Sequence, residues 1–221
     1  MIQERIISLL IGYAFGNILF GFFYGKLRNT DIRKQGSGNI GSTNTLRIMG
    51  VLPGFLSLFC DCLKVVLGAV VVSMVFKGYS PENLSLLRMY AACGTVLGHD
   101  FPVILKFKGG KGIAASLGFL AVVCPVFLPV AVTVFFMAVI FTRFVSLGSI
   151  MTAGVIFVQT IVFFCIGALP FSGGYAVEAL IIIMFLCLLA IFLHHGNIDR
   201  LMHGRENKFS FHPNTNKPKE A

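Results

Sequence analysis

One stretch of the chain, Gly98–Ala115, sets lysines and glycines between two apolar runs. Its candidates for binding an anion are Lys106, Lys108, Gly109, Gly110, Lys111 and Gly112. Glycine leaves backbone N–H groups approachable, and a following helix would add the positive end of its dipole. The pattern predicts an anion site, with phosphate as the expected ligand. A juxtamembrane turn whose lysines face anionic lipid headgroups is the alternative. The ATPase motif GxxxxGK[ST] is absent, since Leu105 and Gly112 occupy two of its defining positions.

A second polar stretch, Gly36–Asn44, reads GSGNIGSTN and is followed by Arg47. It matches GxGxxG, but a basic loop precedes it where a dinucleotide fold requires a strand, so we reject that reading. Its candidate substrate-binding and catalytic positions are Gly36, Ser37, Gly38, Asn39, Thr43 and Asn44. Arg47 would add a bidentate charge for phosphate or carboxylate. An ordinary flexible loop is the alternative.

Histidines mark two further places. His99 stands beside Asp100, where an apolar run ends. It is either an interfacial side chain or, near a phosphate loop, a hydrogen-bond donor, a cation or a general base.

The last polar stretch, His194–Lys208, reads HHGNIDRLMHGRENK. In a helix, His194, Asn197 and Arg200 would share one face, and Lys208 adds a further basic group. The two adjacent histidines lack a carboxylate at ligand spacing, so no metal site is expected. A basic segment leaving the membrane is the alternative.

Composition places these stretches in a membrane protein. Of 221 residues, 56% are hydrophobic and 12% are charged. A soluble domain of this size could not bury so much apolar surface. The net charge of +9 resides in short loops between apolar runs, which suits a cytoplasmic membrane face and not nucleic acid. The six cysteines lie inside apolar runs, so we expect small buried side chains without disulfides.

Apolar runs long enough for membrane spans are Ile6–Tyr24, Leu52–Phe76, Leu86–Leu105, Ser146–Ala168 and Tyr175–Leu193. The second span carries Asp61 and Lys64, which are three residues apart and so share a helix face. Such charges are costly at this depth, and they form either a structural ion pair or part of a catalytic site. Residues 113–142 contain Pro125 and Pro129, and they form either one long tilted helix or two short ones.

The distribution of basic segments decides between these two arrangements. Loop 25–50, loop 106–112, the turn at Arg143 and the C-terminal tail should all face the cytoplasm. Only two short helices at 113–142 satisfy this. We therefore expect an all-α polytopic integral membrane protein with about seven transmembrane helices, the N-terminus outside and the C-terminus cytoplasmic. Residues 1–221 would form a single transmembrane domain, with 208–221 as a frayed tail.

The three polar stretches then meet on one membrane face, where they could hold more than one anion. The nucleophile motif GxSxG is absent, which weakens covalent acyl transfer. The residues fit a reaction in which the substrate already carries a good leaving group and the protein binds charge and positions the partners.

Three sequences together, GSGNIGSTNTLR, GHDFPVILKFKGGKGIA and HHGNIDRLMHGRENK, closely resemble the motifs of the bacterial acyl-phosphate:glycerol-3-phosphate acyltransferase family, the PlsY type. The segment DCLK also resembles that family's Asp-x-x-Lys, so the resemblance covers nearly the whole chain. It implies transfer of a fatty acyl group from acyl phosphate to the 1-hydroxyl of glycerol 3-phosphate, giving lysophosphatidic acid and phosphate. This is the first step of phospholipid biosynthesis. The resemblance further implies the bacterial inner membrane and no metal, other cofactor, coenzyme A or acyl carrier protein.

Carried over by motif, Ser37 and Arg47 are the essential pair of the first loop, and Gly109–Gly112 is the glycerol-3-phosphate loop. His194 and Asn197 contribute to activity, and Glu206 is chiefly structural. His195 departs from the arginine that the family often shows, so no fixed charge is expected there. From the residues we expect Ser37, Arg47 and Lys111 to stabilise phosphate charge, and the proton to go to His99 or to the departing phosphate.

Two other function classes remain open on the sequence. One is a transporter of a phosphorylated solute, which the confinement of the polar loops to one face disfavours. The other is a different membrane enzyme acting on lipid phosphates, such as a phosphatase or a phosphotransferase.

Overall fold

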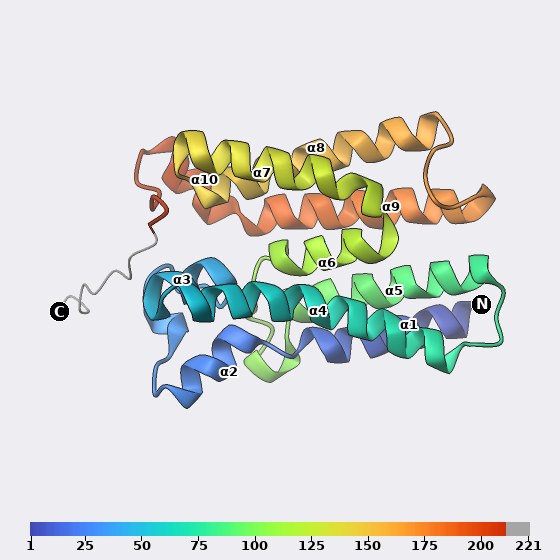
Figure 1. The fold of residues 1–221 in the computed structure, drawn as a ribbon, viewed down its shortest axis with the longest axis horizontal. Coiled ribbons are helices and arrows are strands. Elements are labelled where there is room, and N and C mark those ends of the chain that lie inside the picture. Colours follow the sequence, from blue (N-terminus) through green and yellow to red (C-terminus); the bar gives the residue numbers. More distant parts are fainter. Residues whose placement is uncertain (211–221) are drawn as a thin grey trace.

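The computed structural model describes residues 1–210 as a bundle of helices (Figure 1). Its helices of eleven residues or more are α1 Ile2–Gly16, α4 Val51–Val75, α5 Pro81–Asp100, α6 Ile113–Val123, α7 Leu128–Thr142, α8 Val145–Cys165 and α9 Gly173–Leu193. Shorter helices are α2 Phe20–Leu27, α3 Ser42–Met49 and α10 His195–Met202, with 3₁₀ turns at Ile32–Lys34, Val103–Leu105 and Pro125–Phe127. The predicted all-α class is confirmed.

Five of these stretches are long and apolar enough to cross a membrane: Ile2–Leu27, Val51–Val75, Pro125–Thr142, Val145–Cys165 and Gly173–Leu193. Helix α5 has 20 residues but is less apolar, and α6 has 11. The spans predicted over Leu52–Phe76, Ser146–Ala168 and Tyr175–Leu193 begin and end close to α4, α8 and α9.

The span predicted over Ile6–Tyr24 lies within the apolar stretch Ile2–Leu27, which is broken inside, because α1 ends at Gly16 and α2 begins at Phe20. The amide of Asn17 donates to the carbonyl of Tyr13 at 2.8 Å, so it competes with the helical hydrogen bonds at this point. The break exposes backbone carbonyls inside the bundle, and these need donors from elsewhere.

The third predicted span, Leu86–Leu105, is displaced toward the N-terminus by about five residues. Helix α5 begins at Pro81, where Pro at the first helical position and the Ser80 hydroxyl, which accepts from the Asn83 N–H, form the start. It ends at Asp100, because Pro102 lacks an N–H and restricts the residue before it.

The interval 113–142 forms two helices, as the basic segments predicted. Helix α6 stops at Val123, a 3₁₀ turn begins at Pro125, and α7 follows from Leu128. Figure 1 shows the chain reversing direction between α6 and α7. The long tilted helix is therefore excluded.

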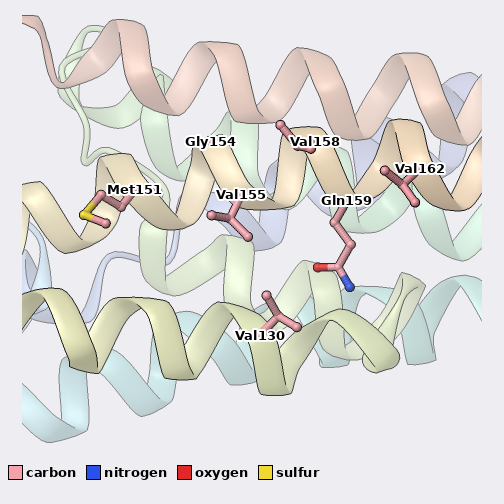
Figure 2. Close-up of a pocket in the computed structure, with 7 residues that line it drawn as sticks. All are labelled: Val130, Met151, Gly154, Val155, Val158, Gln159 and Val162. Carbon is pink, nitrogen blue, oxygen red and sulfur yellow. The ribbon is translucent and has the colours of Figure 1, made fainter.

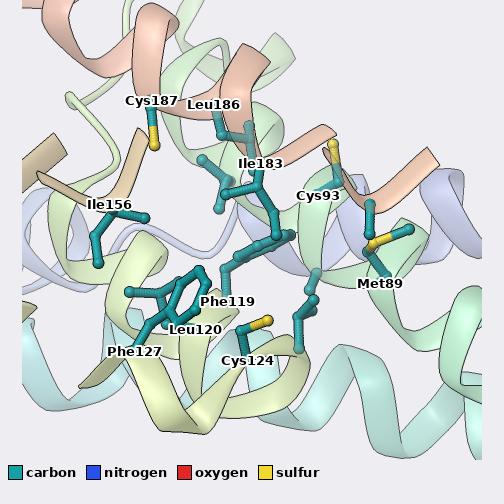
Figure 3. Close-up of a cluster of buried hydrophobic side chains, with 14 of the residues drawn as sticks. Met89, Cys93, Phe119, Leu120, Cys124, Phe127, Ile156, Ile183, Leu186 and Cys187 are labelled. Atoms are coloured by element: carbon teal, nitrogen blue, oxygen red, sulfur yellow. The ribbon is translucent and has the colours of Figure 1, made fainter. Parts of the chain in front are cut away.

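A cluster of buried side chains joins the two halves of the bundle (Figure 3). Cys93 of α5, Phe119 of α6 and Ile183 of α9 belong to it, and Phe127 stacks edge-on against Phe163 with ring centroids 5.0 Å apart. Cys93, Cys124 and Cys187 are buried here as free thiols, as predicted, whereas Cys165 is exposed.

Helices α1 and α5 approach each other through glycines on both sides. A Cβ at Gly94 of α5 would overlap the carbonyl of Leu9, and one at Gly12 of α1 would overlap the backbone of Ala91. Such a close pair of backbones is typical of membrane helices with small interfacial residues.

The two ends of the bundle differ in character. The N-terminus, the turn between α4 and α5 and the turn between α8 and α9 lie at one end of Figure 1, whereas α2, α3 and α10 lie at the other. The predicted basic loop 25–50 thus contains a helix, α3, at its end. Most of the tail predicted to fray, residues 208–221, lies outside the described residues.

We expect Gly94→Ala to lower the melting temperature of the purified protein by about 5 °C or more, because the added methyl group overpacks the α1–α5 contact. Thermal unfolding in detergent measures this. Gly154→Ala is the matched control, since a Cβ there meets nothing within 4 Å. Equal melting temperatures for the two variants would contradict the packing described.

Candidate functional site

Asn44 organises the first polar loop. Its side chain is buried, its Oδ1 accepts from the Ser37 N–H at 2.9 Å, and its Nδ2 reaches the carbonyls of Ile32, Gln35 and Asn39. Both the amide nitrogen and the amide oxygen are therefore engaged within the loop. Asn44 thus holds the loop in this structure, and the expectation that it also binds substrate stays a prediction.

Glycines make this loop possible. Gly36 and Gly38 have φ values of +59° and +73°, in the left-handed region, and a Cβ at Gly36 would overlap Asn44 Oδ1. The same hypothetical Cβ would lie 3.5 Å from Arg47 Cδ, so the loop lies against Arg47. Asn39 caps the loop by accepting from the Gly41 N–H at 2.9 Å. Ser37, the residue after Gly36, is left exposed.

Arg47 on α3 is half-buried and forms no hydrogen bond or ion pair with another of the residues 1–210. Burial is the main cause that lowers its pKa, while Glu206 raises that pKa and Arg200 lowers it. Arg47 therefore belongs electrostatically with the C-terminal stretch, and its guanidinium is available for an anion.

The glycine-rich loop after α5 folds back onto the end of that helix. The Gly109 N–H donates to the carbonyl of Asp100 at 3.1 Å, and the Gly110 N–H donates to that of His99 at 3.0 Å. These two N–H groups bond the end of α5, so they hold the loop in this structure, and the expectation that Gly109 and Gly110 bind phosphate stays a prediction. What the loop presents is the Lys111 side chain and the start of α6, for which Gly112 is the N-cap residue with φ +68°.

Lys111 connects this loop to the C-terminal stretch. Its Nζ donates to Asn197 Oδ1, while Asn197 Nδ2 donates to Glu206 Oε1 at 3.0 Å. Arg200 Nε donates to Glu206 Oε2 at 2.8 Å. Asn197 and Glu206 therefore hold Lys111 and Arg200 in place. The geometry fits the structural role expected for Glu206.

Burial and the nearby Arg200 lower the pKa of Lys111 to about 8, against a smaller opposing effect of Glu206. Arg47, Lys111 and Arg200 thus form a cluster of three cations around one carboxylate, Glu206. An excess of positive charge in a half-buried place favours an anionic ligand.

His194 lies next to this cluster, buried at the end of α9. Burial is the main cause that lowers its pKa to about 4, and Lys111 also lowers it. At neutral pH the ring is therefore uncharged. Its Nδ1 is 2.7 Å from the carbonyl of Ala190, so Nδ1 carries the proton and Nε2 has a free lone pair.

His99 occupies a different place. It is only 3% exposed, so the alternative of an interfacial side chain is excluded. Its Nδ1 lies 2.9 Å from Lys64 Nζ and 3.4 Å from Asp61 Oδ1, and its ring lies directly behind Gly110, where a Cβ would overlap Nε2. His99 supports the glycine-rich loop from inside the bundle.

The ion pair predicted between Asp61 and Lys64 is present, with Oδ1 and Nζ 2.8 Å apart. Lys64 Nζ also donates to the carbonyls of Gly16 and Ile18, at 3.1 and 2.9 Å. These are the carbonyls freed at the break between α1 and α2. The pair is structural, because both side chains are buried and directed at the backbone and at His99.

Two predicted positions stay apart from the cluster, and one residue was missed. Within residues 1–210, Lys208 forms no hydrogen bond to the other site residues, and its neighbour Phe209 pairs with Arg143 at the α7–α8 turn. Thr43 lies on α3, and its side chain forms no hydrogen bond to the cluster within the described part of the chain. The residue that was missed is Asp100, whose buried carboxylate lies beneath Gly112. Its position next to the helix-ending Phe-Pro pair was the available signal.

No three side chains of His, Cys, Asp or Glu lie close enough to share a metal ion anywhere in residues 1–210. The cationic cluster itself would repel a metal ion.

Comparison with known proteins shows which family this chain resembles. Residues 6–204 match the family model described as glycerol-3-phosphate acyltransferase. A protein of Syntrophotalea carbinolica named glycerol-3-phosphate acyltransferase is 41% identical over 204 residues, covering 92% of this chain and 96% of its own. One of the same name from Shouchella clausii is 35% identical over 211 residues, covering 94% and 97% of the two chains.

Two solved structures share the fold. The crystal structure of PlsY, an integral membrane glycerol 3-phosphate acyltransferase, in its glycerol 3-phosphate form has a TM-score of 0.79 and 33% identity, covering 93% of this chain and 96% of that one. Its lysophosphatidic acid form has a TM-score of 0.76 and 32% identity, covering 94% and 96%.

We expect Lys64→Met to destabilise the protein by about 3 kcal/mol or more, because it leaves Asp61 charged and unpaired in the bundle. The double variant Lys64→Met/Asp61→Leu should recover part of this loss, although the carbonyls of Gly16 and Ile18 still lack their donor. Unfolding of both variants in detergent measures the effect, with exposed Lys108→Met as control. If the double variant loses as much stability as Lys64→Met and Asp61→Leu lose together as single variants, the pairing is contradicted.

Proposed function

The chain belongs to the glycerol-3-phosphate acyltransferase family, and from that premise we propose that it transfers a fatty acyl group from acyl phosphate to the 1-hydroxyl of glycerol 3-phosphate. The products are lysophosphatidic acid and phosphate. The observation that carries this proposal is the cluster of Arg47, Lys111 and Arg200 around the single carboxylate of Glu206. Both substrates bring a phosphate, and this cluster has the excess positive charge that two phosphates require.

Each polar stretch has a distinct role in the proposal. Lys111 and the first turn of α6 hold the phosphate of glycerol 3-phosphate, because the Lys111 ammonium and the unpaired N–H groups of a helix start converge there. Ser37 and Arg47 hold the phosphate of the acyl donor, because Asn44 fixes the loop at Ser37 and the neighbouring Gly36 lies against Arg47. Gly112 allows this geometry because a Cβ there would press on Asp100.

The reaction needs little covalent chemistry from the protein. The 1-hydroxyl oxygen attacks the carbonyl carbon of the acyl phosphate, and the bond from that carbon to the bridging phosphate oxygen breaks. Phosphate leaves with its charge held by Arg47 and Lys111, which lowers the barrier most where the charge develops. Orientation of the two substrates supplies the rest.

The hydroxyl proton goes to the departing phosphate. His99 is a poor acceptor, because its ring is buried behind Gly110 and its Nδ1 faces Lys64 and Asp61. The free Nε2 of His194 lies beside the cluster and orients a substrate hydroxyl as a hydrogen-bond acceptor. Its pKa of about 4 makes it too weak a base to keep a proton at neutral pH.

The mixed anhydride is already activated, so the proposal includes no metal, coenzyme A or acyl carrier protein. The acyl chain stays among the apolar helices while both phosphates meet at the polar end of the bundle. Residues 1–221 act as one catalytic domain.

For the membrane arrangement we propose seven crossings in the bacterial inner membrane, the five long apolar stretches together with α5 and the short α6. The N-terminus lies outside, and the C-terminal stretch and the site lie on the cytoplasmic face. Support comes from the basic segments, since α3 and α10 are at the same end of the bundle (Figure 1).

The direct test gives the purified protein acyl phosphate and labelled glycerol 3-phosphate in detergent. We expect labelled lysophosphatidic acid and one equivalent of phosphate, with turnover reduced about a hundredfold or more in Arg47→Ala. Hydrolysis of acyl phosphate without labelled lysophosphatidic acid would replace the proposal with a lipid-phosphate hydrolase. Labelled solute crossing sealed vesicles would replace it with a transporter.

We also expect kcat/KM for glycerol 3-phosphate to fall as the pH rises through about 8. The lowered pKa of Lys111 means that its ammonium is charged below this pH and neutral above it, so phosphate affinity is lost on the alkaline side. Lys111→Arg should move this fall to higher pH, because a guanidinium stays charged. An unchanged alkaline limb in Lys111→Arg would exclude Lys111 as the titrating group.

A further inference from the structure

A groove between α4, α5 and α6 lies at the end of the bundle opposite the candidate site. It has a volume of about 690 Å³, and its walls are formed by Val66, Val70 and Met74 of α4 and by Val122 of α6. Val66 and Met74 are eight residues apart, so this apolar wall runs for about 12 Å along the helix. It leads toward the turn between α4 and α5, which lies at the end where Figure 1 marks the N-terminus.

The groove becomes basic at that turn. Lys77 and Arg88 line it there together with Ser73, and Arg88 Nε donates to Ser73 Oγ at 2.7 Å. The contact fixes the guanidinium against α4 and leaves its two terminal NH₂ groups for another partner. The groove thus has a fixed polarity, with cations at one end and hydrocarbon along its length.

Neither cation forms an ion pair with the acids in residues 1–210. The acids at this end already have partners: Glu4 is bonded by the N-terminal ammonium group and Tyr79, Glu178 by Arg5 and Tyr90, and Glu82 by Ser172. A partly buried arginine at membrane depth is costly unless an anion accompanies it. The protein does not supply that anion.

We propose that this groove binds one anionic phospholipid, with its phosphate on Arg88 and Lys77 and an acyl chain along Val66, Val70 and Met74. The guanidinium matches phosphate in a bidentate way, and the apolar walls match the chain. A zwitterionic lipid fits less well, because its headgroup brings a cation toward two cations. The site lies away from Arg47 and Lys111, so the inference does not depend on the proposed reaction.

A second groove, between α7 and α8, differs from the groove at Arg88. Its lining in Figure 2 is apolar apart from Gln159, whose amide points from α8 toward α7. It carries no charge that would select a headgroup. Charge complementarity therefore distinguishes the groove at Arg88.

Native mass spectrometry of the detergent-purified protein, titrated with phosphatidylglycerol or phosphatidylcholine, tests the proposal. We expect one phosphatidylglycerol to bind about tenfold more tightly than phosphatidylcholine, and Lys77→Gln/Arg88→Gln to abolish this preference. The control Lys26→Gln/Arg28→Gln removes the same charge from exposed positions at the other end and should keep it. A preference that survives in Lys77→Gln/Arg88→Gln, or is absent in the wild-type protein, overturns the proposal.

A second variant keeps the test decisive if the first one does not fold. Val70→Trp fills the groove without changing its charge, and Val70 is exposed enough to accept the larger ring. We expect the tightly bound phosphatidylglycerol to be lost while acyl transfer continues at the wild-type rate. Unchanged phosphatidylglycerol affinity in Val70→Trp would show that the lipid binds elsewhere and would overturn the proposal.

Discussion

The half of the bundle that carries the candidate site depends on the ammonium group of Lys64. This group lies inside an apolar helix, where burying an isolated charge would cost a large free energy. It pairs with Asp61 and donates hydrogen bonds to the carbonyls of Gly16 and Ile18. These contacts tie α4 to the break between α1 and α2. Through His99 they continue to the end of α5 and the back of Gly110. A structural ion pair thus sets the position of a functional loop.

The site has the opposite electrostatic design. Lys64 and Asp61 pair with each other inside the bundle, whereas Arg47, Lys111 and Arg200 share one carboxylate, Glu206. The excess positive charge is stable because it is only half-buried and because Asn197 holds Lys111 by a neutral amide. In the proposed reaction, substrate phosphates supply the missing negative charge. A protein that binds an already activated donor can rely on such fixed charges, since it does not need a strong nucleophile of its own.

The opposite end of the bundle also contains both charges with partners and cations without an ion pair. Glu4, Glu82 and Glu178 have partners within the protein, whereas Lys77 and Arg88 form no ion pair among residues 1–210 and Arg88 donates to the Ser73 hydroxyl. In both places an unpaired cation beside apolar helices marks where an anionic amphiphile fits. The difference lies in accessibility: the site at Lys111 is built from loops, whereas Arg88 faces a groove along the helices.

The sequence alone determined the membrane class, most spans, the helix reversal at Pro125 and the three polar stretches, because hydropathy, proline and basic loops act locally. It also determined the Asp61–Lys64 pair, which follows from a spacing of three residues within one helix. It did not predict the partners of the glycine N–H groups, Asn44 and His99, because these depend on which distant group each one meets. Gly110 is bonded to the end of α5, Asn44 to the loop it closes, and His99 to a helix 35 residues earlier. Only the tertiary structure decides such partners, since a buried polar group is satisfied by whichever donor or acceptor the packing brings within reach.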